Sequence, residues 1–283
     1  MRSIFLEIKF KGGLGNQLFQ YATARNLCIE KKISYLLLNT ESYKNDSLGR
    51  SFSLTKLQVK GTVIKSNRVK KIFRKHTKIN KIFTAFSLHK NITEDNFSIQ
   101  EIKEKTGLLT SLDGYWQSQV YFNNIRHILL KEFTPLYLPV LPDWVAEKNT
   151  IAVHVRRKDY LTEKRYGFLG TDYYEAAITM LNQKLTDPLF VFFSDDIYWC
   201  KTTFRSNRII FCEDEQWDTD YLQLYLISKC AHQVIANSSF SWWGAWLNTN
   251  PQKIVIRPAK PFKEKSLLYE YHYPEEWISV NNE

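Results

Sequence analysis

The stretch IAVHVRRKDY, residues 151–160, decides the fold of the second half of the chain. It begins with apolar, mostly β-branched residues, which are typical of a strand buried inside a parallel sheet. It then turns polar, with Arg156, Arg157, Lys158 and Asp159 in succession. Such a strand delivers charge to the carboxyl edge of its sheet, where open α/β sheets bind their ligands. Guanidinium groups at that edge can bind phosphate oxygens in bidentate fashion.

A strand end flanked by solvated charges is the alternative interpretation of this cluster. His154 favours a functional site, because an imidazole without a role is poorly placed inside an apolar run. The residues that follow alternate between strand and helix patterns, which predicts a parallel α/β sheet. We expect strands at 151–155, 189–193, 208–211, 233–236 and, as the last one, 253–256. We expect helices at 173–184, at 219–230 and from residue 237.

Polar groups follow three of these predicted strands. They are His154 and Arg156, then Asp195 and Asp196, then Asn237, Ser238 and Ser239. Three such exits in one sheet would converge on a single crevice. The Asn-Ser-Ser run is typical of a helix N-terminus, and its repeated capping residues favour a phosphate site over simple capping. For the two aspartates, a divalent cation, a helix cap and a hydrogen bond to guanine all stay open.

The sequence pattern of the first half predicts a βαβ unit at its start. We predict a strand at 4–10, a glycine loop at 11–16 (KGGLGN), a helix at 17–27 and a strand at 34–38. The loop lacks the third glycine of the dinucleotide fingerprint, so it does not predict a dinucleotide site. A turn that needs positive φ is one interpretation. The amides of Asn16 and Gln17 at the head of a helix favour a site that hydrogen-bonds sugar hydroxyls.

Two further segments of the first half are informative. Residues 112–122 are rich in aromatic and amide side chains, which suits a carbohydrate surface, although an ordinary core also needs aromatic residues. A helix is expected at 125–133, and the prolines of 135–142 indicate a linker between domains 1–140 and 141–283. The tryptophans at 242, 243 and 246 are interpreted as packing residues.

Length and composition narrow the class of protein. The 283 residues suit one large domain or two of ordinary size. There is no run of 18 apolar residues, so no transmembrane helix is expected, and the charged N-terminus does not resemble a signal peptide. The four cysteines follow no metal-ligand spacing and are expected to be reduced and mostly buried, as in a cytoplasmic protein.

Positive charge is concentrated in the first half. The net charge is 39 − 29 = +10, with 21 − 9 = +12 in residues 1–113 and 18 − 20 = −2 in the remainder. Residues 56–90 contain no acidic side chain, and 64–90 has the spacing of amphipathic helices. Packing on the core is favoured over peripheral membrane contact. A solvated basic face and a nucleic-acid-binding protein are alternatives, but no recognised nucleic-acid motif is present.

Four segments together resemble glycosyltransferase family 11, the α-1,2-fucosyltransferases. They are the glycine loop with its helix (12–22), the GYWQS segment with Tyr121 and Phe122, the HVRRKDY segment (154–160) and residues 237–247. Lys158 stands where many members have glycine. The resemblance implies a GT-B fold, with two Rossmann-like domains facing across a cleft. The first domain would face the acceptor, and the second would bind GDP-β-L-fucose.

The resemblance also implies a reaction. L-fucose would pass with inversion from GDP-fucose to the 2-hydroxyl of a galactoside, without an obligatory metal or other cofactor, in bacterial surface polysaccharide or O-antigen synthesis. A glycosyltransferase that uses another nucleotide sugar is the main alternative. Arg156 and His154 are expected at the diphosphate, and Asp159 and His154 are the candidate bases, with a structural pairing to Arg157 as the alternative for Asp159. The remaining substrate-binding candidates are Gly13, Asn16, Gln17, Arg157, Asp195, Asn237, Ser238, Ser239 and Phe240.

Overall fold

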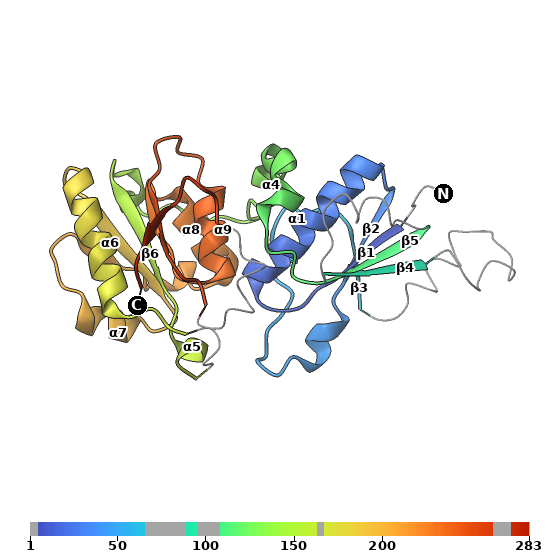
Figure 1. The fold of residues 1–283 in the computed structure, drawn as a ribbon, viewed down its shortest axis with the longest axis horizontal. Coiled ribbons are helices and arrows are strands. Elements are labelled where there is room, and N and C mark those ends of the chain that lie inside the picture. The colour runs from blue at the N-terminus through green and yellow to red at the C-terminus, as the bar shows by residue number, and fades with distance from the viewer. Residues whose placement is uncertain (1–4, 66–88, 95–107, 163–166, 263–272, 283) are drawn as a thin grey trace, which may run out of the picture. The chain divides into compact units, whose positions relative to one another are not determined.

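The computed structural model describes residues 5–65, 89–94, 108–162, 167–262 and 273–282. The chain divides into two compact units, Met1–Thr134 (unit 1) and Pro135–Glu283 (unit 2). Each unit contains a parallel sheet with helices packed on it (Figure 1). The predicted α/β class with two Rossmann-like domains is therefore confirmed. Most of the basic segment 56–90, and with it the helices expected at 64–90, lies outside the described residues.

The sheet of unit 1 has the order β3-β2-β1-β5-β4, and all its described strand pairs are parallel. β1, the predicted first strand, is buried along almost its whole length between β2 and β5. The carboxyl ends of β1 and β5 are therefore neighbours. The strands are β1 (Phe5–Lys9), β2 (Tyr35–Asn39), β3 (Thr62–Ile64), β4 (His89–Thr93) and β5 (Leu109–Asp113).

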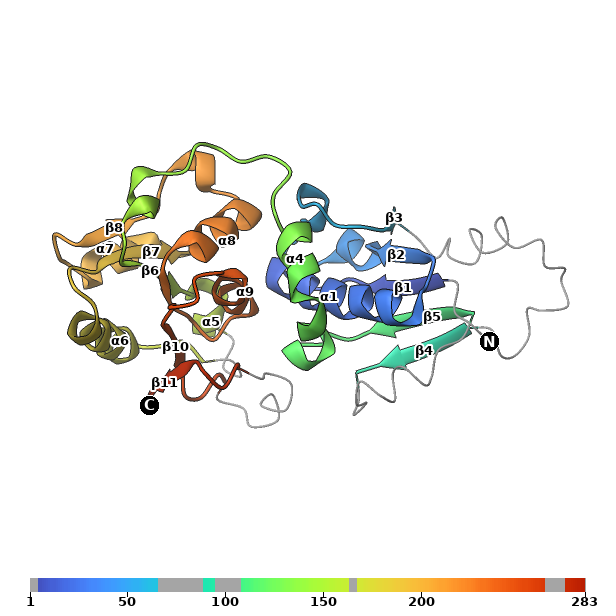
Figure 2. The same cartoon turned by 90° about the horizontal axis from the view of Figure 1, so that it is seen from above.

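Helix α1 (Leu14–Lys31) packs along the unit 1 sheet (Figure 2). It begins three residues earlier than predicted, because Gly13 is already its N-cap and the end of the expected glycine loop is helical. It ends at Lys32, which adopts a left-handed conformation with φ 52°. The other helix in the described part of this unit is α4 (Arg126–Glu132). The 3-10 turns described there are η1 (Glu41–Asn45), η2 (Leu54–Lys56), η4 (Gln119–Tyr121) and η5 (Asn123–Ile125).

The sheet of unit 2 has the order β11-β10-β9-β6-β7-β8, again with parallel pairs. The apolar run 151–155 lies in β6, whose six residues are all buried between β9 and β7. The strand expected at 253–256 is β10, but it is not the last, because β11 follows it. The strands are β6 (Thr150–Val155), β7 (Leu189–Ser194), β8 (Ile209–Phe211), β9 (His232–Val234), β10 (Val255–Pro258) and β11 (Ile278–Val280).

The helices of unit 2 cover its sheet with two apolar clusters. One includes Tyr173, Tyr174 and Leu181 of α6, and the other includes Leu222 and Leu226 of α8. The three tryptophans of α9 are at most 3% exposed and contact one another at ring-centroid distances of 5.0–6.0 Å, which confirms their packing role. The helices are α5 (Lys158–Thr162), α6 (Thr171–Lys184), α7 (Ile197–Thr203), α8 (Asp220–Lys229) and α9 (Ser239–Leu247), with 3-10 turns η6 (Asp143–Ala146) and η7 (Glu215–Trp217).

Two expectations from composition have structural counterparts. Within the described ranges, no helix combines the length and the apolar character that a membrane crossing requires. The four cysteines are free thiols, and Cys28, Cys200 and Cys230 are buried while Cys212 is half-buried.

Candidate functional site

Three strand exits meet at the carboxyl edge of the unit 2 sheet. β6 lies between β9 and β7, so the loops that follow these three strands are neighbours. Several contacts join them directly, and two of these involve the exits of all three strands. The Nη1 of Arg156 lies 3.1 Å from Asp195 Oδ2, and the hydroxyl of Tyr160 donates to the carbonyl of Asn237 at 3.1 Å. The predicted convergence of polar groups therefore follows from the strand order.

Arg156 stands at the centre of this edge. Its Nη2 lies 2.8 Å from Asp159 Oδ1, and its guanidinium lies 5.8 Å from the ring centre of Tyr160. Burial alone lowers the pKa of Arg156, but the hydrogen bond to Asp159 and the charges of Asp195 and Asp159 raise it overall. The side chain is 35% exposed. Arg156 is thus a fixed, permanently charged cation with one part open to solvent.

Arg157 has a different surrounding from Arg156. Its guanidinium lies 3.9 Å from the ring centre of Trp199, and its Nε contacts Asp196 Oδ2 at 3.2 Å. Its side chain is only 13% exposed, and a second ring, Phe168, lies 5.8 Å away. Arg157 therefore connects the loop after β6 to helix α7, and its guanidinium is enclosed by protein groups.

The two aspartates after β7 are also engaged by protein groups. Asp195 accepts from the backbone N–H of Arg157 at 2.9 Å and pairs with Arg156. Asp196 caps α7 by accepting from the N–H of Trp199 at 3.2 Å and pairs with Arg157. Both carboxylates thus hold the two arginines and the adjoining loop in place. Helix capping, one of the interpretations of this pair, describes Asp196.

His154 is a buried polar group at the same edge. It is 7% exposed, and its ring lies 5.2 Å from the ring of Phe240. Burial, with a smaller contribution from the charge of Arg156, lowers the pKa of His154 to about 3. The imidazole is therefore neutral at physiological pH. Its buried Nδ1 has no hydrogen-bond partner among the described residues, which leaves it available to a ligand group.

The first residues of α9 complete the edge. Ser238 is the N-cap and accepts from the N–H of Phe240 at 3.2 Å, while Ser239 and Phe240 are half-buried. Asn237 is 2% exposed and donates to the carbonyls of Gly167 and Pro261. Asn237 therefore connects neighbouring loops. The N-terminus of α9, with its free N–H groups, is suited to hold an anion near Arg156.

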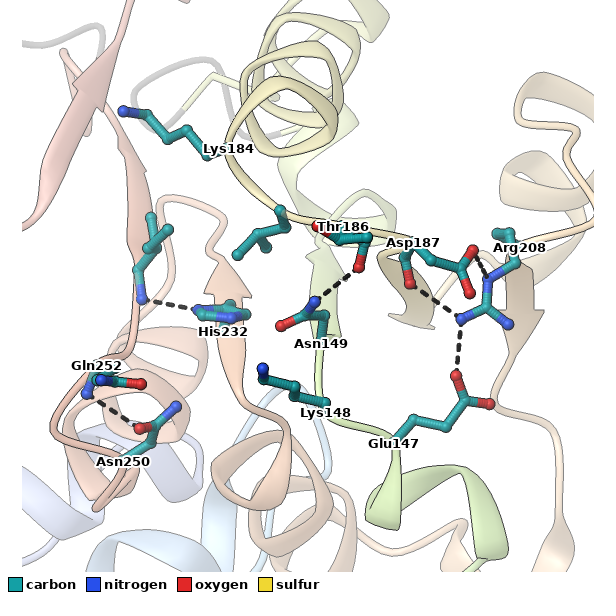
Figure 3. A pocket seen from close by; sticks show the side chains of 12 residues that line it. Glu147, Lys148, Asn149, Lys184, Thr186, Asp187, Arg208, His232, Asn250 and Gln252 are labelled. Carbon is teal, nitrogen blue, oxygen red and sulfur yellow. Dashed lines mark hydrogen bonds and ion pairs between the residues drawn. The ribbon is translucent and has the colours of Figure 1, made fainter.

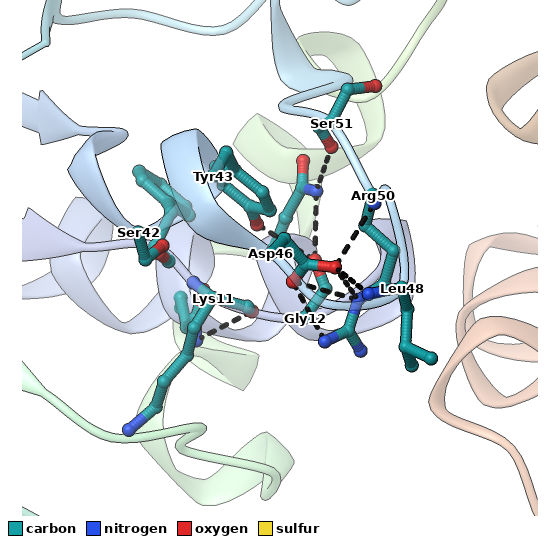
Figure 4. A network of polar contacts seen from close by, with 11 residues as sticks. Lys11, Gly12, Ser42, Tyr43, Asp46, Leu48, Arg50 and Ser51 are labelled. Carbon is teal, nitrogen blue, oxygen red and sulfur yellow. Dashed lines mark hydrogen bonds and ion pairs between the residues drawn. The ribbon is translucent and has the colours of Figure 1, made fainter.

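The glycine loop of unit 1 has its own network of polar contacts (Figure 4). Tyr43 donates to the carbonyl of Gly12 at 2.8 Å, and Gly12 has φ +83°. A Cβ on Gly12 would lie 2.4 Å from Asn16 Nδ2, so glycine is required there. Gly13 differs, because its φ is −74° and a Cβ would meet nothing within 4 Å. Neither conformation nor crowding demands a glycine at position 13.

The two amides that follow in α1 have structural roles. Gln17 is fully buried, donates to the carbonyl of Ser51 at 2.8 Å and accepts from the N–H of Ser53 at 2.9 Å. Gln20 donates to the carbonyl of Gly114 at 3.1 Å. The side chain of Gln17, a predicted substrate contact, is therefore fully used in bonds to the loop at Ser51 and Ser53. Asn16, the other predicted contact, is half-buried and keeps part of its surface exposed.

A cavity of about 760 Å³ lies at the opposite, amino-terminal edge of the unit 2 sheet (Figure 3). Its lining includes Asn149, Arg208 and His232. Arg208 is held there by Glu147 at 2.7 Å and Asp187 at 3.0 Å. None of the predicted site residues lines it, so this cavity is separate from the edge that carries Arg156.

Sequence reasoning missed several residues that shape these edges. Tyr160 lies beside Arg156, Trp199 packs on the guanidinium of Arg157, and Gln117 of unit 1 donates to Asn16 Oδ1 at 2.7 Å. Tyr160 and Gln117 lie within the quoted segments and could have been selected there. Trp199 gave no signal, because its contact with Arg157 depends on the packing of α7 against β7.

Comparisons with known proteins agree with one another on the family. The model of "Glycosyl transferase family 11" matches residues 5–281. An α-1,2-colitosyltransferase of Escherichia coli is 33% identical, over 96% of this chain and 97% of its own length. The O-antigen biosynthesis glycosyltransferase WbnK of Escherichia coli is 29% identical, over 89% and 93%. A mouse galactoside 2-α-L-fucosyltransferase, Sec1, is 23% identical, over 96% and 73%.

Solved structures agree on the fold. A mutant of Arabidopsis thaliana FUT1 in complex with GDP aligns with a TM-score of 0.50 at 10% identity, over 92% of this chain and 71% of that chain. A glycosyl transferase family 9 protein from Veillonella parvula aligns with a TM-score of 0.50 at 7% identity, over 99% and 88%. With a family model that spans nearly the whole sequence and a relative of similar length, this chain belongs to glycosyl transferase family 11.

Proposed function

We propose that this glycosyltransferase moves L-fucose from GDP-β-L-fucose to the 2-hydroxyl of a galactoside, with inversion, in the synthesis of a bacterial surface polysaccharide. The observation that carries this proposal is the edge of the unit 2 sheet, where Arg156, the unpartnered Nδ1 of His154 and the N-terminus of α9 lie together. A cation, a neutral imidazole and free helix N–H groups suit a diphosphate. Family membership and an α-1,2-linking relative support the reaction type.

The proposed mechanism is a single displacement through an oxocarbenium-like transition state. The bond from the anomeric carbon to the β-phosphate oxygen breaks as the acceptor oxygen attacks from the other face. The leaving GDP gains negative charge as this bond lengthens. Arg156 is held in advance by Asp159 and Asp195, so it stabilises that charge without reorganising.

The proton of the acceptor 2-hydroxyl passes to a general base as the new bond to the anomeric carbon forms. Asp159 and His154 were the candidates for this base from sequence. Asp159 pairs with Arg156 at 2.8 Å, not with Arg157, and the pKa of His154 is lowered to about 3. An imidazole of such low basicity is a weak proton acceptor, and the carboxylate of Asp159 is already engaged by Arg156. These contacts support roles for the two residues in positioning and donor binding.

We further propose that transfer proceeds without a metal ion. Asp195 and Asp196 are the carboxylates that could hold a cation at the donor edge, and both already bind arginines. Arg156 supplies the positive charge that a metal would otherwise bring to a diphosphate. Undiminished transfer in excess EDTA is the expected result.

A second donor is favoured by one relative. The α-1,2-colitosyltransferase is 33% identical over nearly the whole chain. Colitose is L-fucose without its 3-hydroxyl, so the two GDP-sugars present the same diphosphate and differ in one hydrogen-bonding group. A site that binds the 3-hydroxyl rejects the deoxy sugar, whereas an apolar site discriminates weakly. GDP-colitose is therefore the alternative donor.

The test is transfer to methyl β-D-galactoside with GDP-fucose, GDP-colitose, GDP-mannose and UDP-galactose supplied separately. We expect a product from GDP-fucose in which NMR shows an α-linked fucose on the 2-oxygen of the galactoside. A product from GDP-colitose alone would replace the proposed donor. Transfer from UDP-galactose would contradict the proposal. So would a protein that neither hydrolyses nor transfers the sugar of any GDP-sugar.

Gly13 provides a prediction that separates ligand approach from folding. Because a Cβ there meets only open space, Gly13→Ala should change the free energy of unfolding by about 1 kcal/mol or less, the usual size of an N-cap effect. Turnover should nevertheless fall at least about tenfold if substrate contacts this backbone, since a displaced contact of about 1.4 kcal/mol has that effect. Urea unfolding and initial rates are the measurements. Gly12→Ala is the matched variant, in which loss of stability should accompany loss of turnover.

A further inference from the structure

The carboxyl edge of the unit 1 sheet carries a second group of polar side chains. We define the edge patch as Lys11, Asn16, Asp113, Tyr115 and Gln117, all half-buried. Lys11 follows β1, Asn16 lies in the first turn of α1, and the other three are at or after the end of β5. The pairing of β1 with β5 brings these three segments together.

The loop after β5 is held in an unusual conformation. Trp116 has φ +58°, although it is fully buried and is not glycine. Glu94 accepts from the backbone N–H groups of Tyr115 and Trp116, and a Cβ on Gly114 would lie 2.6 Å from Glu94. Strained backbone of this kind is found where a fold fixes residues for a purpose. Here it buries Trp116 and leaves Tyr115 and Gln117 partly exposed.

Two amides of the patch form a pair. Gln117 Nε2 donates to Asn16 Oδ1 at 2.7 Å, which orients both side chains. This bond leaves the Oε1 of Gln117 as an acceptor and the Nδ2 of Asn16 as a donor, and no bond to either atom is present in the described part of the chain. Adjacent donor and acceptor groups match a sugar hydroxyl, which both donates and accepts.

Asp113 places a carboxylate beside this pair. It lies 3.4 Å from the Nζ of Lys9 and 3.1 Å from that of Lys11, and its side chain is 36% exposed. Burial raises the pKa of Asp113, but Lys11 and Lys9 lower it overall, so it stays ionised. Lys11 Nζ also lies 4.9 Å from the ring centre of Tyr115. A carboxylate, amides and an aromatic ring are groups that bind neutral sugars, and the charge of Asp113 is balanced here by its two lysines.

We propose that the edge patch is the acceptor subsite, in which Asp113 and the Asn16–Gln117 pair bind hydroxyls of the acceptor sugar and Tyr115 contacts its face. This inference rests on the proposed function. It assigns acceptor choice to unit 1 residues that lie apart from the donor edge in sequence.

Steady-state kinetics with GDP-fucose and methyl β-D-galactoside tests the assignment. Asp113→Asn and Gln117→Ala should each raise the acceptor KM about tenfold to a hundredfold, as expected for a lost hydrogen bond. The GDP-fucose KM, GDP binding by calorimetry and slow hydrolysis of GDP-fucose should stay within about twofold. Glu41→Gln, which removes a unit 1 carboxylate outside the patch, is the control and should change none of them. Circular dichroism confirms folding.

A second measurement does not depend on turnover. Saturation-transfer NMR with GDP present should show magnetisation transfer to the galactoside in the unchanged protein and at least about tenfold weaker binding in Gln117→Ala. An unchanged acceptor KM, or a rise in the donor KM in its place, would overturn the subsite. If the unchanged protein hydrolyses GDP-fucose, the proposed donor chemistry stands whatever the patch variants show. If it neither binds GDP nor hydrolyses GDP-fucose, the proposed function fails and the subsite with it.

Discussion

Arg156→Ala is expected to lower turnover by about two to three orders of magnitude, the effect of losing about 3–4 kcal/mol of preorganised stabilisation. The reason is geometric. Two carboxylates hold this guanidinium at the end of β6, the strand that lies beside β9 in the sheet. Charge that develops on the leaving diphosphate would meet a cation already in place. Single-turnover rates at saturating GDP-fucose are the measurement, because they isolate the chemical step from substrate binding.

The fold should survive this change. Arg156 is 35% exposed, and Asp195 keeps its bond to the backbone N–H of Arg157 when Arg156 is lost. Arg205→Ala removes the same charge from an exposed position and should leave turnover unchanged. Arg156→Lys should recover only part of the rate, since an ammonium lacks the bidentate geometry. A folded Arg156→Ala protein with near-normal turnover would refute the assignment.

Much of the carboxyl edge of the unit 2 sheet was predictable because parallel sheets impose a simple rule. Buried strands read as apolar runs, and their carboxyl ends align at one edge, so the polar residues after β6, β7 and β9 had to come close together. Sequence alone could not say which of two adjacent arginines would be enclosed. That difference depends on Trp199, forty-two residues after Arg157, which packs on its guanidinium.

Two strands of unit 1 that sequence reasoning missed share a physical cause. β4 (HKNIT) is an exposed edge strand with one buried residue, and β5 (LTSLD) buries Thr110 and Ser111 completely. Neither shows the apolar run or strict alternation from which strands are recognised. Gln17 was assigned to the ligand because an amide at a helix head looks available. Its capture by Ser51 and Ser53 depends on a loop more than thirty residues away.

One polar group buried inside unit 1 is equally hard to read from sequence. Glu132, the last residue of α4, is 5% exposed. It accepts from Arg25 Nε at 3.0 Å and Nη2 at 2.9 Å and from the hydroxyl of Tyr21 at 2.6 Å. Tyr21 also accepts from the N–H of Lys60. Burial and then the hydrogen bond to Glu132 raise the pKa of Tyr21 far above its usual value. This network ties α1 to α4.

Glu132→Ala is expected to destabilise unit 1 by about 3–5 kcal/mol, because it leaves Arg25 largely buried without its counter-ion. That is a large share of the stability of an ordinary domain, about 5–15 kcal/mol. Because the chain has two compact units, hydrogen exchange of α1 amides as a function of urea measures the effect where it arises. Amides of β6 in unit 2 serve as the internal reference.

Two variants test whether the cost arises from the unpaired charge. Replacing both partners, Arg25→Met with Glu132→Leu, should restore a good part of the lost stability, since apolar substitutes carry no desolvation penalty. Glu41→Ala breaks an exposed ion pair with Lys44 and should cost at most about 1 kcal/mol. A cost for Glu132→Ala no greater than that of Glu41→Ala would contradict the prediction. If the double variant is no more stable than Glu132→Ala, the uncompensated cation is not the source of the lost stability. The loss would then come from the packing of the Glu132 side chain between α1 and α4.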